Sequence, residues 1–301
     1  MNEKVKCAVI GFSSIGMDLI YRLRRSPLLE PVWLVGVDPQ SQYLTEAKGL
    51  GLKVTHQGVR GFLPHVVEDG VQIAFNAAQG VGQDEASRSL NALGVITVGL
   101  ASTGDGVHCV PALNLPKLIA NGVQHLQLAT ATGQAAVPIV SAISQVQDVD
   151  YAEVVINVAP ASMTCENTEA LAQATIGALI RVGGAKHGKV HAIVKPNLGS
   201  SAVISCIVES EPRRDDIVDS VQRMIGKVRR YVPGYSLISG PYFDGNLITF
   251  GISSSEGESA LPVGFAHEEI MASSAVHSAE ALVDRIKSIG RVSSDFDVLP
   301  T

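Results

Sequence analysis

Cysteine is scarce in this sequence, and its spacing excludes the common cysteine sites. The 301 residues include only Cys7, Cys109, Cys165 and Cys206, and no two of them have the CxxC spacing of a zinc or redox site. Isolated thiols are typical of a reducing compartment, where disulfides are rare. We therefore expect a cytoplasmic protein without a metal centre.

Basic clusters and long apolar runs are missing as well. The formal net charge is −6, which makes nucleic acid and anionic membranes poor partners. No segment reaches the ~20 apolar residues of a membrane span. Gly11 and Asp18 interrupt the apolar run that follows Lys6, so we expect no secretory signal peptide. The remaining composition, 46% hydrophobic and 17% charged, is typical of a compact protein with two domains.

The N-terminal residues have the pattern of a dinucleotide-binding unit. We expect a strand over 5–10, a turn over 11–16, a helix through Arg25 and a strand over 32–37. Such a helix start presents N–H groups to a pyrophosphate, and the following Asp38 accepts ribose hydroxyls and favours NAD over NADP. Because Ser13 replaces the second glycine, the alternative is a retained turn that no longer holds a cofactor. The expected cofactor-binding residues are Gly11, Ser13, Ser14, Ile15, Gly16, Asp38 and Ala78.

Strands and helices continue to alternate, which predicts an α/β fold: a Rossmann NAD-binding domain plus a central α+β substrate and dimerisation domain. Further strands are expected over 72–76, 95–100 and 126–130, the last ending at Ala131, and a helix over 85–93. After Pro138 the pattern changes to strands over 151–159, 190–194 and 202–208 and helices over 169–182 and 215–231. A closing helix over 268–287 is expected to return to the first domain. The predicted domains are therefore 1–131 with 266–301, and 132–265.

Eight segments, in order along the chain, resemble the acylating acetaldehyde dehydrogenases that partner 4-hydroxy-2-oxovalerate aldolases. They are 6–11 (KCAVIG), 35–38 (VGVD), 109–115 (CVPALNL), 133–138 (GQAAVP), 151–153 (YAE), 182–185 (VGGA), 231–235 (YVPGY) and 269–271 (EIM). The resemblance runs almost end to end. It implies an NAD cofactor, a Rossmann domain closed by the C-terminal helix, a homodimer formed through the central domain, and an aldolase as a partner.

The family's reaction needs a cysteine that this chain lacks. In the family a cysteine attacks the aldehyde, a hydride leaves to NAD, and coenzyme A takes the acyl group. The matching position is Ala131, and the neighbouring family glycine is Thr132. The resemblance also matches the altered loop 161–165 to the loop beside the active site. It matches His267 to an asparagine near the nicotinamide and Glu169 to an aspartate beside that loop.

Few residues are candidates for the remaining chemistry. His267 can act as a general acid–base near neutral pH, or it can simply flank the closing helix. Thr132 and Glu169 are further catalytic candidates, although no base adjoins Thr132 in the sequence. Cys165 could replace the missing thiol, but the neighbouring acidic residues raise a thiol pKa. Cys109 matches a family cysteine that takes no part in the chemistry.

Two hypotheses from different classes follow. The first is an NAD(H)-dependent oxidoreductase that acts on a small carbonyl or imine between the domains, without a thioester, and with His267 as the proton donor. The second is a non-redox or non-catalytic scaffold, including one that partners an aldolase. Asp38 favours the first hypothesis, whereas Ser13 and Ala131 favour the second.

Overall fold

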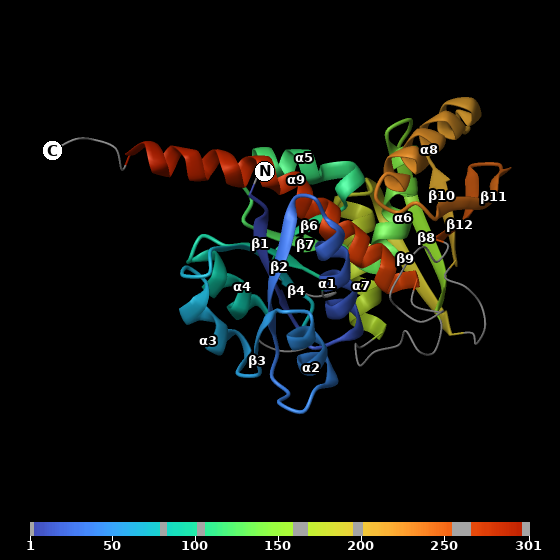
Figure 1. The fold of residues 1–301 in the computed structure, drawn as a ribbon. Coiled ribbons are helices and arrows are strands. Elements are labelled where there is room, and N and C mark those ends of the chain that lie inside the picture. Colours follow the sequence, from blue (N-terminus) through green and yellow to red (C-terminus); the bar gives the residue numbers. More distant parts are fainter. Residues whose placement is uncertain are drawn as a thin grey trace. The chain divides into compact units, whose positions relative to one another are not determined.

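The computed structural model describes residues 3–78, 83–100, 106–158, 168–194, 201–254 and 266–296 (Figure 1). The chain divides into two compact units. The first unit comprises Met1–Val98, Pro116–Leu126 and Ala275–Thr301, and the second comprises Gly99–Leu115 and Gln127–Ser274. These bounds differ from those of the predicted domains, 1–131 with 266–301 and 132–265, and that division stays a prediction.

A seven-stranded sheet has the order β3-β2-β1-β4-β5-β7-β6. Its strands are β1 (Val5–Ile10), β2 (Leu29–Val35), β3 (Lys53–Thr55), β4 (Val71–Asn76), β5 (Ile96–Gly99), β6 (Val107–Cys109) and β7 (His125–Leu128). The helices along this part of the chain are α1 (Ser14–Arg25), α2 (Gln42–Gly49), α3 (Gly58–Phe62), the 3₁₀ helix η1 (Leu63–His65), α4 (Gln83–Asn91) and α5 (Pro111–Ala120). Strand β1 pairs in parallel with β2 and β4, which confirms the expected α/β class.

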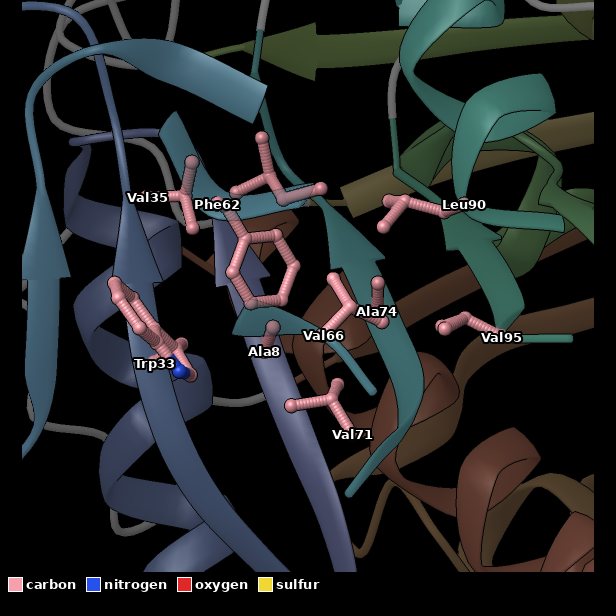
Figure 2. Close-up of a cluster of buried hydrophobic side chains, with 10 residues drawn as sticks. Ala8, Trp33, Val35, Phe62, Val66, Val71, Ala74, Leu90 and Val95 are labelled. Atoms are coloured by element: carbon pink, nitrogen blue, oxygen red, sulfur yellow. The ribbon is translucent and has the colours of Figure 1, made fainter. Parts of the chain in front are cut away.

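The core of the first unit includes a cluster of buried hydrophobic side chains from β1, β2, β4 and their neighbours. These three strands are apolar along most of their length, which is typical of strands that are buried on both faces of a parallel sheet. Figure 2 shows the side chains of this cluster gathered around Phe62. The Trp33 and Phe62 rings lie with their centroids 5.3 Å apart. Because the Trp33 Nε1–H donates to Asp69 Oδ2 at 2.7 Å, the indole is buried without an unpaired donor.

The second unit contains a five-stranded sheet of order β11-β12-β10-β8-β9. Its strands are β8 (Val149–Val158), β9 (Ala185–Val194), β10 (Ser201–Val208), β11 (Tyr235–Asp244) and β12 (Leu247–Ser254), and the sequence patterns did not predict the last two. The helices are α6 (Ala131–Ser144), α7 (Thr168–Arg181) and α8 (Arg214–Arg229). Helix α6 contacts β8, β10 and β12, whereas α7 contacts β9 and α8 contacts β11.

Among the described residues, one face of this sheet is covered by helices and the other carries exposed side chains. Along β10 the residues alternate, with Ile204 and Cys206 fully buried and Val203 and Ile207 42% and 41% exposed. Residues in register with the exposed ones on neighbouring strands share their face. We call this surface the open face and define it by Tyr151, Glu153, Val155, His187, Lys189, His191, Val203, Ser205, Ile207, Leu247 and Thr249.

Helix α6 is the central element of the second unit, and the sequence patterns did not predict it. Eleven of its fourteen residues are buried, so it is a core helix without a solvent-exposed polar face. The expected strand over 126–130 is present as β7, but its expected end at Ala131 was wrong: β7 stops at Leu128 and Ala131 is the first helical residue. The physical reason is Thr130, whose side chain accepts the N–H of Gly133 and so starts a helix.

The C-terminal helix α9 (Ala266–Phe296) begins near the expected position and runs beyond the expected end at Lys287. In the first unit its Arg285 donates to the carbonyls of Val123 and Gly122, at 2.9 and 2.8 Å, and its Glu280 accepts from the hydroxyl of Ser26 at 2.6 Å. Within the described ranges, no helix is both long enough and apolar enough to cross a membrane.

Candidate functional site

The turn after β1 requires glycine at two positions for steric reasons. Gly11 has a φ of 120°, and a Cβ there would lie 2.7 Å from Ala78 N and 2.8 Å from Ala77 C. A Cβ on Gly16 would lie 2.5 Å from the Gly11 carbonyl oxygen, so α1 packs directly against the turn. These are the roles of the first and third glycines of a dinucleotide-binding turn, namely the tight turn and the close packing of helix and strand.

Between these glycines lies Ser13, the N-cap residue of α1. Its backbone is extended, with φ −151° and ψ 166°, and its Oγ accepts the Gly16 N–H at 3.2 Å. Ser14 and Ile15 are the first two helical residues. Ser13 is therefore a typical serine N-cap, and the Gly16 N–H in the first turn of α1 already has a hydrogen-bond acceptor.

The other predicted cofactor-binding residues lie close to this turn. Gly11 N–H donates to the Val35 carbonyl at the end of β2, and the Ala78 backbone borders Gly11. Asp38 follows β2 by three residues and is exposed, and its Oδ1 accepts the Gln40 N–H at 2.9 Å, which orients the carboxylate. The structure thus brings the seven predicted residues to the carboxyl ends of β1, β2 and β4, where ligands bind in parallel sheets.

A second feature is the N-terminus of α6, which a buried chain of hydroxyl groups holds in place. Thr130 Oγ1 accepts the Gly133 N–H at 2.9 Å and lies 2.6 Å from Thr175 Oγ1. Thr175 in turn lies 2.8 Å from the Leu171 carbonyl oxygen, an acceptor, so we assign Thr175 as its donor and Thr130 as the donor to Thr175. Every member of the chain then has its hydrogen bonds satisfied, as burial demands.

This helix start borders a small cavity of about 20 Å³ within the second unit. The lining combines methyl and alkyl groups with hydroxyls, and its residues are Ala131, Thr132, Ala135, Ile156, Ser201, Ala202, Ile252, Ser253, Ser254 and Ile270. No acid, base or thiol occurs among these lining residues. The cavity can therefore hold a small neutral group and orient it through hydroxyls, and the lining residues that the structure describes include no proton donor that titrates near neutral pH.

The three predicted catalytic residues lie in different environments, and only one of them is shown to line the cavity. Thr132 lines the cavity and is buried. Glu169 lies in the first turn of α7, is exposed, and its Oε1 accepts from Gln173 Nε2 at 2.9 Å, so it is not part of the cavity lining. His267 is the second residue of α9, but its side chain lies outside the described residues, as do Cys165 and the loop 161–165.

The described cysteines do not supply a nucleophile. Cys7, Cys109 and Cys206 are all buried. Burial raises the pKa of Cys206 to about 12 and that of Cys7 well above its ordinary value. Near neutral pH these two thiols therefore stay protonated, and the thiolate is the reactive form.

Gln134 is a structural residue that the sequence analysis missed. Its side chain is fully buried, and its Nε2 donates to the carbonyls of Cys109 and Ala129, at 2.9 and 3.2 Å. These bonds tie the ends of β6 and β7 to the first turn of α6. A glutamine within an apolar run of the sequence indicates a buried side chain that forms structural hydrogen bonds, because a buried amide must have partners. Thr175 gave no such signal, since its partner Thr130 is far away in the sequence.

Comparison with known proteins places these features in a wider context. A family model described as "Prokaryotic acetaldehyde dehydrogenase, dimerisation" matches residues 131–262. The chain is 43% identical over 290 residues to acetaldehyde dehydrogenase 1 of Azoarcus sp. (strain BH72), covering 94% of this chain and 95% of that one. It is 41% identical over 292 residues to acetaldehyde dehydrogenase of Ralstonia pickettii (strain 12J), covering 95% and 94%.

The hydroxyl chain at the start of α6 leads to the first testable prediction. We expect Thr130→Val to lower the free energy of unfolding by about 1–3 kcal/mol, because the buried Gly133 N–H loses its acceptor and α6 loses its cap. Urea unfolding followed by far-UV circular dichroism measures this change. Ser41→Ala is the matched control, since Ser41 precedes α2 without a side-chain cap bond, and we expect a change below ~0.5 kcal/mol. Equal effects of the two substitutions would contradict the role of Thr130.

Proposed function

Because the chain belongs to the acetaldehyde dehydrogenase family, we propose that it is an NAD(H)-dependent oxidoreductase. The observation that carries this proposal is the turn after β1, where a side chain on Gly11 would collide with the backbone of Ala77 and Ala78. Such a cradle, with Asp38 beyond the neighbouring strand, fits a dinucleotide. When bound, the nicotinamide donates or accepts a hydride.

The proposed reaction differs from that of the family in lacking a thioester. By resemblance, position 131 matches the nucleophilic cysteine, and an alanine methyl cannot attack a carbonyl. The described lining of the cavity next to it includes Thr132 and other hydroxyl-bearing residues and no acid or base. This favours hydride transfer directly at the carbon of a small carbonyl or imine, with one proton going to its oxygen or nitrogen.

The chain's own residues would position the substrate and move that proton. We assign substrate orientation to the Thr132 hydroxyl, which is buried at the cavity wall. We assign the proton to His267, whose place in the first turn of α9 follows Ile252–Ser254 of β12 in the chain and precedes the cavity residue Ile270. A catalytic role of Glu169 stays a prediction, because its carboxylate is bonded to Gln173 in the structure.

The alternative function is a non-redox or non-catalytic scaffold, such as a binding subunit for an aldolase. Ser13 is the observation that favours it. The Ser13 side chain stands where a dinucleotide needs glycine, and it already holds the Gly16 N–H. The two functions differ in whether the unmodified chain binds NADH.

We also propose that a second copy of this chain covers the open face of the five-stranded sheet. The face carries exposed apolar side chains near its centre and charged ones toward β9, which is the pattern of a protein interface. The matched family model, described as a dimerisation model, spans all five strands within 131–262. A homodimer through this face would bury Val203 and Ile207, which are otherwise about two-fifths exposed.

We expect Val203→Asp to convert the dimer to a monomer, because a charge would then be buried at the centre of the interface without a partner. Sedimentation velocity at micromolar protein measures the mass, and circular dichroism confirms that the variant is folded. Val67→Asp is the control, since Val67 is 72% exposed in the first unit, and it should leave the dimer intact. A wild-type monomer, or a Val203→Asp dimer of unchanged strength, would refute this interface.

We expect no acylating aldehyde dehydrogenase activity with acetaldehyde or propanal, NAD and coenzyme A, because loss of a nucleophile typically lowers the rate on the order of 10⁶-fold. Ala131→Cys should not restore full activity, since Thr132 and the loop 161–165 also depart from the family. Its thiol pKa should nevertheless be lower than that of Ala135→Cys, because only position 131 lies in the first turn of α6. Alkylation rates against pH measure both pKa values. Wild-type turnover at ordinary enzyme rates would contradict the proposal.

We expect the unmodified chain to bind NADH more tightly than NADPH, because the Asp38 carboxylate accepts ribose hydroxyls and repels a 2′-phosphate. Asp38→Ala should weaken NADH roughly ten- to a hundredfold and reduce the discrimination. Calorimetric titration measures both affinities. His267→Ala is the control and should leave NADH affinity unchanged, since we assign it the proton and not the nucleotide. If neither nucleotide binds the unmodified chain at millimolar concentration, the oxidoreductase proposal fails.

A further inference from the structure

A dinucleotide-binding turn has glycine at three positions, and the turn after β1 has glycine at the first and third of them and serine at the second. Gly11 and Gly16 are sterically necessary in the chain itself, since a Cβ at either would collide with backbone atoms. The middle position differs, because the extended backbone of Ser13 is open to any residue. Glycine at that position would serve only the close approach of a pyrophosphate. Serine and glycine cap a helix almost equally well, so the difference between them at this position concerns mainly the approach of a ligand.

Ser13 is also held firmly in place. Its Oγ accepts the Gly16 N–H, one of the first-turn amides through which a helix start binds an anion. The ring of the preceding residue, Phe12, packs over Gly36 so closely that a Cβ on Gly36 would lie 2.3 Å from it. The hydrogen bond holds the Ser13 hydroxyl at the start of α1, on the side from which a phosphate would approach the first-turn amides.

We propose that Ser13 limits the affinity of the nucleotide site, because its Cβ and hydroxyl hold back the pyrophosphate of a dinucleotide. The site thereby discriminates against ligands that carry a bridging pyrophosphate and leaves recognition of the adenosine part through Asp38 unaffected. This inference rests on the proposed function, since it concerns the same nucleotide site. It makes Ser13 an affinity-determining residue and assigns it no part in the reaction.

The test compares Ser13→Gly, Ser13→Ala and the unmodified chain in titrations with NADH, ADP-ribose and adenosine. Serine and glycine differ little as N-caps, so Ser13→Gly should fold normally. We expect Ser13→Gly to tighten NADH and ADP-ribose roughly tenfold, the value of one hydrogen bond to a charged group, and to leave adenosine unchanged. Ser13→Ala keeps the Cβ and should tighten them less. Ser41→Gly, at the uncapped start of α2, is the control and should change nothing.

Each outcome of the titration bears on the inference. Unchanged or weaker NADH binding by Ser13→Gly overturns it, and weaker binding by both Ser13 variants would mean that the hydroxyl is itself a phosphate ligand. If the unmodified chain binds NADH and Ser13→Gly brings no gain, this inference fails and the proposed function stands. If only Ser13→Gly binds NADH, the inference holds and the proposed function fails. If no variant binds any of the three ligands, both fail.

Discussion

The burial of helix α6 is the constraint on which the second unit depends. The sheet, α7 and α8 all contact this helix, so its ends and register must be fixed by bonds from its surroundings. Tyr235 donates its hydroxyl to the Ala135 carbonyl at 2.6 Å, and Ser220 donates to the Ala142 carbonyl at 2.8 Å. Pro138 removes one helical hydrogen bond, yet the helix continues, because packing on all sides outweighs that local loss.

The same constraint governs the chemistry at position 131. A helix start is electrostatically positive, and a thiolate at its first residue would be stabilised there. Ala131 occupies that place with a methyl group, so the favourable field has no anion of the chain to act on. The hydroxyl chain of Thr130 and Thr175 fixes the position of this helix start. On the proposed match of position 131 to the family's nucleophile, the helix start supplies the field that would stabilise a thiolate, and Ala131 supplies no atom that can attack.

Local signals in the sequence were enough for the elements that begin the first unit, but they missed α2, β3 and α3 there and α6, β11 and β12 in the second unit. The strand over 5–10, the turn and the helix ending at Arg25 were predicted correctly, because the apolar run and the glycines that follow it all lie within 21 residues. The helix after Leu128 was not predicted, since Thr130 suits a strand as well as a cap and Pro138 signals an end. What decides between these readings is burial and the bond to Thr175, which is 45 residues away. The predicted roles of His267 and Glu169 stay predictions for the same reason, because sequence spacing gives no side-chain geometry.

A change from cysteine to alanine at position 131 would cost this fold little, and that limits what the fold can reveal. The start of α6 is secured by Thr130 and by Gln134, whose bonds reach the carbonyls of Cys109 and Ala129 and do not involve the side chain at 131. Alanine is also the best helix former, so the methyl group creates no strain there. A reaction can thus be lost at this position while every structural bond around it persists. Close likeness to acetaldehyde dehydrogenases is therefore strong support for the scaffold and weak support for the acylating step, which depends on one atom that the scaffold does not need.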